Sequence, residues 1–434
     1  MELDAQARRL NDIIHGANPA VAGMLSARGR GIFFPKLGVL SQSAEAAGKD
    51  INATIGIALE DEGGPVTLPS IADNLNLPAG DAFPYAPSPG RPDIRKLWRE
   101  MLIRKNAGLA GKSFGQPVVT AALTHGLSMV GYLFCDPGDA VILPDLYWEN
   151  YDLIFSNAYG ARLQTFRTYA PEGGFDVDAL ATSLEGPVGK RIVLLNFPNN
   201  PSGYTPTTIE AKAIASLLIA AAVRGNQVVV LIDDAYFGLV FEEGVYDQSM
   251  FVDLCNAHPN LLAVKIDGAT KEDYVWGFRV GFLTYGVADS TPALYEALEA
   301  KTGGAIRGNI SNASNPAQSL LVRSWTSGTY TAEKRQKYEL LRRRYRAVRE
   351  ILDAHPEYAG QFVPLPFNSG YFMCVRPTHV DAEALRRKLL VDYSTGTINF
   401  NGVLRIAFSA TPTGKLSQLF ENIYRAAGEL AATS

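Results

Sequence analysis

The sequence predicts an α/β protein in which a large domain, built on a mainly parallel mixed sheet flanked by helices, is joined to a smaller α+β domain. Three observations favour this class. From about residue 92 onward, helical patterns alternate with short apolar runs of strand length. The 434 residues are too many for one simple core. From about residue 357 the pattern changes to fewer apolar strands, with helices between and after them.

The elements of the large domain follow in chain order. Helices are predicted over 92–106, 126–134 and 148–160, and strands over 118–123, 140–144, 191–197, 228–233, 261–267 and 278–286. The strands are near-continuous apolar runs, which is typical of a sheet covered on both faces. A long charged helix at 332–355 leaves this domain with a solvated face. Strands at 370–375 and 403–409 then build the smaller domain.

We therefore divide the chain into three parts. Residues 1–55 form an N-terminal segment that packs with the small domain, 56–325 form the large domain, and 326–434 form the small C-terminal domain. The sequence shows no internal repeat and no low-complexity tract.

Composition excludes several classes of partner. The formal net charge of -4 gives no electrostatic footprint for nucleic acid or an anionic membrane, so a small substrate is expected. The most apolar stretch, 213–232, is interrupted by polar residues near Arg224 and cannot span a bilayer. The three cysteines and five histidines are scattered, which argues against a disulfide framework and against a metal site. The N-terminus lacks the apolar core of a signal peptide, and we expect a cytoplasmic protein.

Polar residues follow three of the predicted strands at their carboxyl ends, where ligands of such sheets bind. The run 191–197 leads into PNNPSG, the run 228–233 ends at Asp233 and continues through Asp234 to Tyr236, and the run 261–267 leads to Lys271. Each feature has an ordinary alternative: a surface turn, a helix cap, or a solvated lysine. Together, an amide, a carboxylate, a phenol and a lysine would converge on one cleft.

That set of groups is what pyridoxal phosphate (PLP) requires. A lysine must form a Schiff base with the aldehyde, and a carboxylate must keep the pyridine nitrogen protonated so that the ring accepts electrons. Donors near the phenolic oxygen tune the imine, and an arginine neutralises the phosphate.

The sequence resembles the fold-type I PLP-dependent aminotransferases of class I, the group that includes the aspartate and aromatic amino acid enzymes. The likeness runs from about Ile51 to Ala407. NFPNNPSG at 196–203 resembles the Asn-Pro-Thr-Gly signature of the family, and DDAY at 233–236 resembles its Asp-x-x-Tyr. Thr270 and Lys271, with Arg279 eight residues further on and then Gly281, resemble its lysine motif.

The resemblance assigns roles position by position. Lys271 would form the Schiff base and then act as general base and acid, and Asp233 would pair with the pyridinium nitrogen. Asn200 and Tyr236 would hydrogen-bond the phenolic oxygen, favouring its ionised form. Arg279 would clamp the phosphate.

The resemblance also implies a phosphate turn and a stacking aromatic. Gly126, Leu127 and Ser128 match the phosphate turn, in a segment that follows a strand and opens a helix. Trp148 matches the aromatic that stacks on the cofactor ring, although Tyr147 or Trp148 itself could instead belong to the core. Trp148 is preferred, because the flanking pattern Tyr-Trp-x-x-Tyr at 147–151 lines up with family members.

One departure from the family lies in the lysine motif. The serine usually found three positions before the lysine is replaced by Gly268. We expect one phosphate hydrogen bond to be lost, worth roughly 1.5 to 3 kcal/mol unless water or Thr270 replaces it. Arg279, Ser128 and the helix terminus should still hold the cofactor.

For the substrate, the resemblance implies that Arg405 grips the α-carboxylate, together with Asn200, and that the backbone of Gly56 lies against it. The alternative for Arg405 is an edge-strand arginine in a surface salt bridge. In AIRGNISNASNP at 305–316, Arg307 would reach into the site of a second subunit and bind a distal carboxylate, or else it is structural.

Two further residues imply a homodimer. Ser311 and Tyr85 match residues that cross to the phosphate of the neighbouring subunit, so the sites are expected at the interface of a two-fold pair.

The function that follows is a ping-pong transamination between an L-amino acid, dicarboxylic or aromatic, and a 2-oxo acid. A β-lyase or decarboxylase on the same fold, or a catalytically silent sensor domain, are the alternatives. The segment 397–405 is shorter than in many relatives. Either the entrance is more open, or another segment such as 30–39 covers it.

Overall fold

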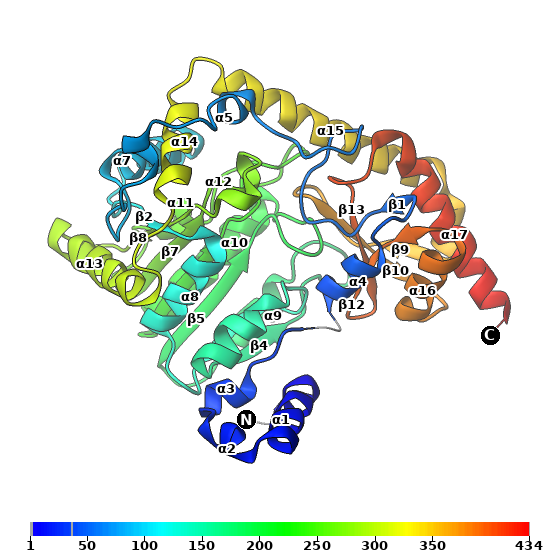
Figure 1. The fold of residues 1–434 in the computed structure, drawn as a ribbon, viewed down its shortest axis with the longest axis horizontal. Helices are drawn as coiled ribbons and strands as arrows, with labels where there is room; N and C mark the ends of the chain where they lie inside the picture. The colour runs from blue at the N-terminus through cyan, green and yellow to red at the C-terminus, as the bar shows by residue number, and fades with distance from the viewer. Residues whose placement is uncertain (1–2, 36–37, 434) are drawn as a thin grey trace.

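A computed structural model describes residues 3–35 and 38–433 (Figure 1). The large sheet has seven strands in the order β2-β8-β7-β6-β5-β3-β4. All of them run the same way except β8, which is antiparallel to both of its neighbours. The strands are β2 (Val118–Thr120), β3 (Ala140–Pro144), β4 (Arg162–Phe166), β5 (Lys190–Asn196), β6 (Gln227–Asp233), β7 (Leu261–Asp267) and β8 (Gly281–Gly286). The predicted mixed, mainly parallel sheet is confirmed.

Helices cover both faces of this sheet, so alternate side chains of its strands enter two different cores. Val193 and Val230 belong to one core, whereas Leu194 and Leu231 belong to the other. The covering helices are α7 (Pro92–Lys105), α8 (Ala122–Phe134), α9 (Val177–Ser183), α10 (Thr208–Val223), α11 (Phe251–Leu254), α12 (Ala269–Glu272), α13 (Pro292–Asn309) and α14 (Asn315–Trp325). Short 3-10 or π turns span Ala107–Leu109, Asp152–Asn157, Trp276–Phe278, Pro356–Gly360 and Thr413–Lys415.

The smaller domain is an antiparallel sheet with helices beside it, as expected from the change of pattern near residue 357. Its strand order is β12-β13-β10-β9. Its elements are β9 (Phe362–Pro364), β10 (Phe372–Pro377), α16 (Ala382–Asp392), β12 (Ile398–Phe400), β13 (Val403–Ala407) and α17 (Leu416–Thr433). The long α15 (Tyr330–Ala354) runs along the top of Figure 1 from one domain to the other.

The N-terminal segment contacts both domains. Strand β1 (Ile51–Asn52) pairs in parallel with β11 (Thr395–Gly396), and α4 (Val39–Glu45) lies against β12. Earlier helices lie at the bottom of Figure 1, below the large domain, where the side chain of Asn157 donates to the carbonyl oxygen of Gly31 at 2.8 Å. These helices are α1 (Ala5–Ala17), α2 (Pro19–Met24) and α3 (Ala27–Gly31). Two short helices follow β1: α5 (Pro69–Ala72) and α6 (Ala79–Ala82). The boundaries after residues 55 and 325 stay a prediction.

One strand was not predicted, and one helix begins earlier than predicted. Strand β4 has the polar sequence RLQTF and lies at the edge of the sheet, so it lacks the apolar run that marks the other strands. Helix α8 begins at Ala122 and not near residue 126. Across the described ranges, the longest helices are too short or too polar for a membrane crossing.

Candidate active site

A cavity of about 410 Å³ opens at the carboxyl ends of the central strands. Asn196 and Asp233 are the last residues of β5 and β6 and lie side by side in the sheet. The next strand, β7, ends at Asp267, and the short helix α12 then carries Lys271 to the cavity. Of the residues predicted for the site, the cavity wall contains Gly56, Trp148, Asn200, Asp233, Tyr236, Thr270, Lys271, Arg279 and Arg405.

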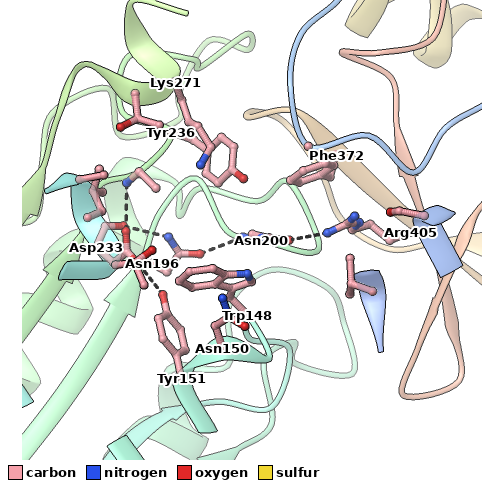
Figure 2. Close-up of a pocket in the computed structure, with 18 of the residues that line it drawn as sticks. Trp148, Asn150, Tyr151, Asn196, Asn200, Asp233, Tyr236, Lys271, Phe372 and Arg405 are labelled. Atoms are coloured by element: carbon pink, nitrogen blue, oxygen red, sulfur yellow. Dashed lines mark hydrogen bonds between the residues drawn. The ribbon is translucent and has the colours of Figure 1, made fainter. Parts of the chain in front are cut away.

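The two domains meet across this cavity. Figure 2 shows Lys271 and Tyr236 entering from one side and Arg405 with Phe372 from the other, with Trp148 between them. The predicted convergence of strand-end residues is therefore present in the geometry.

Lys271 has an amine suited to react near neutral pH. Burial lowers the pKa of Lys271 to about 8, with Arg279 acting in the same direction and Asp233 against it. Its Nζ lies 5.1 Å from the centroid of the Tyr236 ring. At that pKa a useful fraction of the amine is uncharged and nucleophilic at physiological pH.

Asp233 is a buried carboxyl with few neutralising partners. It accepts hydrogen bonds from the hydroxyl of Tyr151 at 2.6 Å and the amide of Ala235 at 3.1 Å. Burial raises the pKa of Asp233 to about 6, although Tyr151, Lys271 and Ala235 oppose the shift. A carboxylate in this position is stabilised by a cationic ring nitrogen, which is the partner that PLP offers.

Arg405 lies in the middle of β13 and is only 5 % exposed, so it is not an edge-strand arginine in a surface salt bridge. Its Nη1 donates to Asn200 Oδ1 at 3.2 Å, and its Nη2 donates to the carbonyl oxygen of Thr54 at 3.1 Å. Its Nε is buried and has no partner among the described residues. Nη1 and Nη2 each carry two N–H groups and use one of them in these bonds, so the guanidinium, held over the ring of Phe372 at 4.3 Å, keeps donors for an anion.

Of the two neighbouring aromatic residues considered for stacking, Trp148 lines the cavity and Tyr147 does not. The Trp148 side chain lies in the wall, whereas the hydroxyl of Tyr147 donates to Asp152 at 3.0 Å away from it. This arrangement matches the preference for Trp148 made from the sequence.

The three residues predicted as the phosphate turn do not line the cavity. Gly126 and Leu127 are buried within α8, and Ser128 is hydrogen-bonded to Tyr159 at 3.0 Å, so the structure does not bring these three residues into the cavity. The first turn of α8 is there instead, through Ala122, Leu123 and Thr124. The start was missed because Ala121, at the N-cap, makes no side-chain cap.

Close packing explains why glycine stands at position 268, and this was not predicted from the sequence. A Cβ built on it would lie 2.7 Å from the carbonyl oxygen of Val280 and 2.8 Å from Cα of Gly281, both of them backbone atoms. The serine of the family would therefore displace β8. Nearby, Thr270 lies in the cavity wall and donates from Oγ1 to Val280 at 3.4 Å.

The three residues predicted to serve a neighbouring subunit lie outside this cavity. Tyr85 is 92 % exposed. Arg307 is exposed and donates to Ser311 Oγ at 2.9 Å. Their predicted roles require a second copy of the chain and stay predictions.

Several wall residues were not predicted. Tyr151 orients Asp233, and Asn196 joins two loops by donating to the carbonyl oxygen of Asp233 and accepting from the amide of Asn200, each at 2.9 Å. Both had a signal, because Tyr151 closes the Tyr-Trp-x-x-Tyr pattern and Asn196 opens NFPNNPSG. The others are Val39, Ser43, Thr54, Ala122, Leu123, Thr124, Asn150, Ala235 and Phe372.

The N-terminal segment borders the cavity, which bears on whether another segment covers the entrance beside the short stretch 397–405. Val39 and Ser43 of α4 lie in the wall, and the amide of Val39 donates to Glu149 Oε2 at 3.3 Å. Another segment thus accompanies the short 397–405 stretch at the site. Residues 36 and 37 of the suggested 30–39 cover lie outside the described residues.

Fold and site together define a PLP-dependent enzyme of the aspartate aminotransferase-like fold. The donor set fits the cofactor, because an amine (Lys271), a buried carboxyl (Asp233) and a guanidinium (Arg279) all face one cavity. The family model for aminotransferase class I and II matches residues 49–423, and the chain belongs to that family, whose members use pyridoxal phosphate.

Curated relatives are similar over part of their length. The aspartate aminotransferase of Rhizobium meliloti is 28% identical over 243 residues, which cover 52% of this chain and 55% of the relative. A probable N-acetyl-LL-diaminopimelate aminotransferase of Bacillus subtilis is 26% identical over 199 residues, 46% of this chain and 47% of the relative. The chain thus spans about half the length of the curated relatives it matches.

Solved structures show the same fold over nearly the whole chain. An aminotransferase from Anaerococcus prevotii has a TM-score of 0.81 at 21% identity, covering 93% of this chain and 99% of that one. The aspartate aminotransferase of Thermus thermophilus with maleate has a TM-score of 0.71 at 19% identity, with the same coverage. At these identities the likeness establishes the fold alone.

Proposed function

We propose that the protein is an aminotransferase that moves an amino group between an L-amino acid and a 2-oxo acid in two half-reactions at one site. The observation that carries this proposal is the convergence of Lys271, Asp233 and Arg405 in one cavity. Membership of the aminotransferase family supports it.

Each residue has a distinct task in this scheme. When bound, PLP supplies an aldehyde that condenses with amines and a ring that accepts electrons. Lys271 Nζ acts first as the general base that takes the proton from the substrate Cα and then as the general acid that gives a proton back. Its lowered pKa suits it to both roles. Asp233, oriented by Tyr151, holds the ring nitrogen protonated.

Binding groups flank this centre. Arg279 and the first turn of α8 receive the phosphate, and Trp148 lies against the ring. Arg405 receives the substrate α-carboxylate through the N–H groups of Nη1 and Nη2 that are not used within the protein, beside Asn200. The cavity between the two domains excludes water as the small domain closes.

We further propose a dicarboxylic amino acid as donor, with aromatic amino acids as the other accepted class. The cations in the described wall are Lys271, Arg279 and Arg405, and the cofactor and the α-carboxylate occupy all three. A distal carboxylate therefore needs a cation from elsewhere, and Arg307 of a second copy is the candidate. This reading makes the protein a homodimer with sites at the interface.

The test is a half-reaction of the PLP-loaded protein with a panel of single amino acids and no acceptor. Aspartate and glutamate should each release one 2-oxo acid per site. Arg307→Ala should slow the acidic donors by about 10-fold or more, the loss of a charged hydrogen bond, and leave aromatic donors nearly unchanged. Arg307→Lys keeps the charge and should lose less.

Other outcomes would contradict the proposal at separate points. Release of ammonia or carbon dioxide in place of stoichiometric amino transfer would indicate a lyase or a decarboxylase. No reaction with any amino acid would indicate a silent domain. Equal loss for acidic and aromatic donors in Arg307→Ala would remove the distal-carboxylate role alone.

A further inference from the structure

A second cavity, of about 450 Å³, lies behind the helix that carries Lys271. The two cavities share no wall residue, and α12 separates them, because Lys271 faces the first and Glu272 faces the second. The wall of the second cavity consists of Met101, Arg104, Lys105, Phe237, Gly238, Asp247, Glu272, Trp325, Tyr330, Thr331 and Lys334.

Aromatic side chains give this cavity flat apolar surfaces. Phe237, Trp325 and Tyr330 are each less than 10 % exposed, and Met101 packs beside them. The polar atoms of two of the rings are already used, since Trp325 Nε1 and the Tyr330 hydroxyl both donate to Asp273, at 2.8 and 2.7 Å. What these rings present to the cavity is therefore apolar surface, which suits a planar hydrocarbon body.

Two of the three cations in the wall are committed to the protein. Lys105 Nζ lies 3.0 and 2.9 Å from the two carboxylate oxygens of Glu272, and Lys334 Nζ lies 2.6 Å from one of them. Burial would raise the pKa of Glu272, but Lys105 and Lys334 lower it to about 2. Glu272 is therefore ionised and neutralised within the wall.

Arg104 is the third cation of the wall, and it is not paired with a carboxylate of the described residues. It lies in the last turn of α7, is exposed, and has no hydrogen-bond or ion-pair partner in the described part of the chain. Its guanidinium is near enough to act on the pKa of Tyr330, which burial and Asp273 raise and Arg104 lowers. Lys334 also pairs with Asp273 at 3.1 Å, so Glu272 and Asp273 together neutralise Lys105 and Lys334, and the donors left for an anion in the described wall are those of Arg104.

We propose that this cavity is a second binding site, for a small aromatic monocarboxylate. The carboxylate pairs with Arg104, where a planar guanidinium offers two parallel donors. The ring of the ligand lies among Phe237, Trp325 and Tyr330. This inference is independent of the reaction proposed for the first cavity.

The test uses 3-phenylpropionate as the probe and removes the competing carboxylate grip of the first cavity. Calorimetric titration of PLP-loaded Arg405→Gln protein should show one binding site. Adding Arg104→Gln to that protein should weaken binding at least about tenfold. The matched control is Lys96→Gln, which removes an exposed cation from the same helix outside the cavity and should leave the Kd within about twofold.

The neutral probe 3-phenylpropanamide separates charge recognition from apolar burial and should bind at least about tenfold more weakly than the acid. Equal binding of acid and amide would overturn the proposal, as would an unchanged Kd in Arg104→Gln. Tighter binding of phenethylamine would assign recognition to Asp247 and overturn it as well. Absence of any heat of binding up to about 10 mM acid would show that the cavity takes no such ligand.

Discussion

Two lysines six residues apart show how neighbours decide the chemistry of one side chain. Lys265 lies within β7, is fully buried and contacts the carboxylate of Asp234, with Asp267 at 3.4 Å. Burial alone would lower the pKa of Lys265, but these two carboxylates raise it. Lys271 has no such contact, and its pKa falls to about 8. The solvated lysine expected as the ordinary alternative is found at neither position.

In the cofactor-free protein, Lys271 should lose its proton near pH 8, because burial and Arg279 outweigh the opposing charge of Asp233. Asp233→Asn removes that opposing charge and should lower the midpoint further, whereas Arg279→Ala should raise it. The check is the pH dependence of acylation at Lys271, followed by peptide mass spectrometry. A midpoint near that of a free lysine would be inconsistent with burial as the cause.

Gly268→Ser should destabilise the protein and loosen the cofactor, even though it restores the residue usual in the family. Its Cβ meets backbone atoms of Val280 and Gly281, which cannot move aside without shifting β8. We expect a loss of roughly 1 to 3 kcal/mol in the free energy of unfolding.

Urea unfolding and retention of PLP on dialysis measure the two effects of Gly268→Ser. Gly277→Ser is the control, because a Cβ at Gly277 meets no atom within 4 Å. Tighter cofactor retention in Gly268→Ser would show that the lost hydrogen bond matters more than the packing.

At the scale of the element, α12 is held by charges and not by its own length. The helix has only four residues, too few for stability by itself. Glu272 ties it to α7 through Lys105 and to α15 through Lys334. Asp273, directly after it, accepts from Trp325 and Tyr330. The position of Lys271 therefore depends on contacts with three other helices.

Glu272→Gln should cost about 3 to 5 kcal/mol of stability at pH 7, because it leaves two partly buried lysines without their partner. The folded-state pKa of Glu272 lies near 2, below the ordinary value of 4.5. This contribution is thus fully present above about pH 4.5 and is lost as the pH falls toward 2.

Urea unfolding of Glu272→Gln at several pH values provides the measurement. Glu60→Gln is the matched control, since Glu60 pairs with Lys337 at 2.7 Å in a more exposed setting and should cost less than about 1 kcal/mol. Equal costs for the two variants would mean that burial adds nothing at α12.

The elements predicted best are those whose burial produces a simple pattern of apolar residues in the sequence. Strands β5, β6 and β7 are buried on both faces and read as apolar runs, so their ends, with Asp233 and the approach to Lys271, were found. Strand β4 lies at the sheet edge with a polar sequence and was missed. The start of α8 lacks a capping side chain, so the helix was predicted to begin four residues too late, and Ala122, Leu123 and Thr124 were not predicted for the cavity wall.

Site residues that come from outside the strand ends were harder to predict for a topological reason. Val39 and Ser43 reach the cavity only because the N-terminal segment folds back against the small domain. Steric contacts such as that of Gly268 with β8 depend on three-dimensional packing and leave no sequence pattern.

At the scale of the whole molecule, the site exists only where three segments meet. Asp233 at the end of β6 and Lys271 on α12 belong to the large domain, and Arg405 belongs to β13 of the small domain. The carbonyl oxygen of Thr54, just after β1, holds the guanidinium. In the proposed function, substrate binding to Arg405 therefore couples the two domains directly.

A second copy of the chain should complete the site, and mixed dimers test this. Lys271→Ala is expected to be nearly inactive, and Arg307→Ala to retain about a tenth or less of the wild-type activity with acidic donors. In a heterodimer of the two, one site has both native residues, so random pairing should restore about a quarter of the wild-type activity.

Co-refolding of the two variants, followed by assay with glutamate, gives that measurement. Each variant refolded alone is the control. If mixing restores nothing, Arg307 does not serve the site of another subunit, and the proposed interface must be reconsidered.

The most direct test of the account is to locate the covalent bond to the cofactor. The protein is incubated with PLP, reduced with borohydride and digested with trypsin. The expected result is a labelled peptide spanning 266–279, because cleavage occurs after Lys265 and Arg279 while the label blocks cleavage at Lys271. Lys271→Ala should give no such peptide. Label at another lysine with Lys271 unmodified, or no label at all, would contradict the assignment of this cavity.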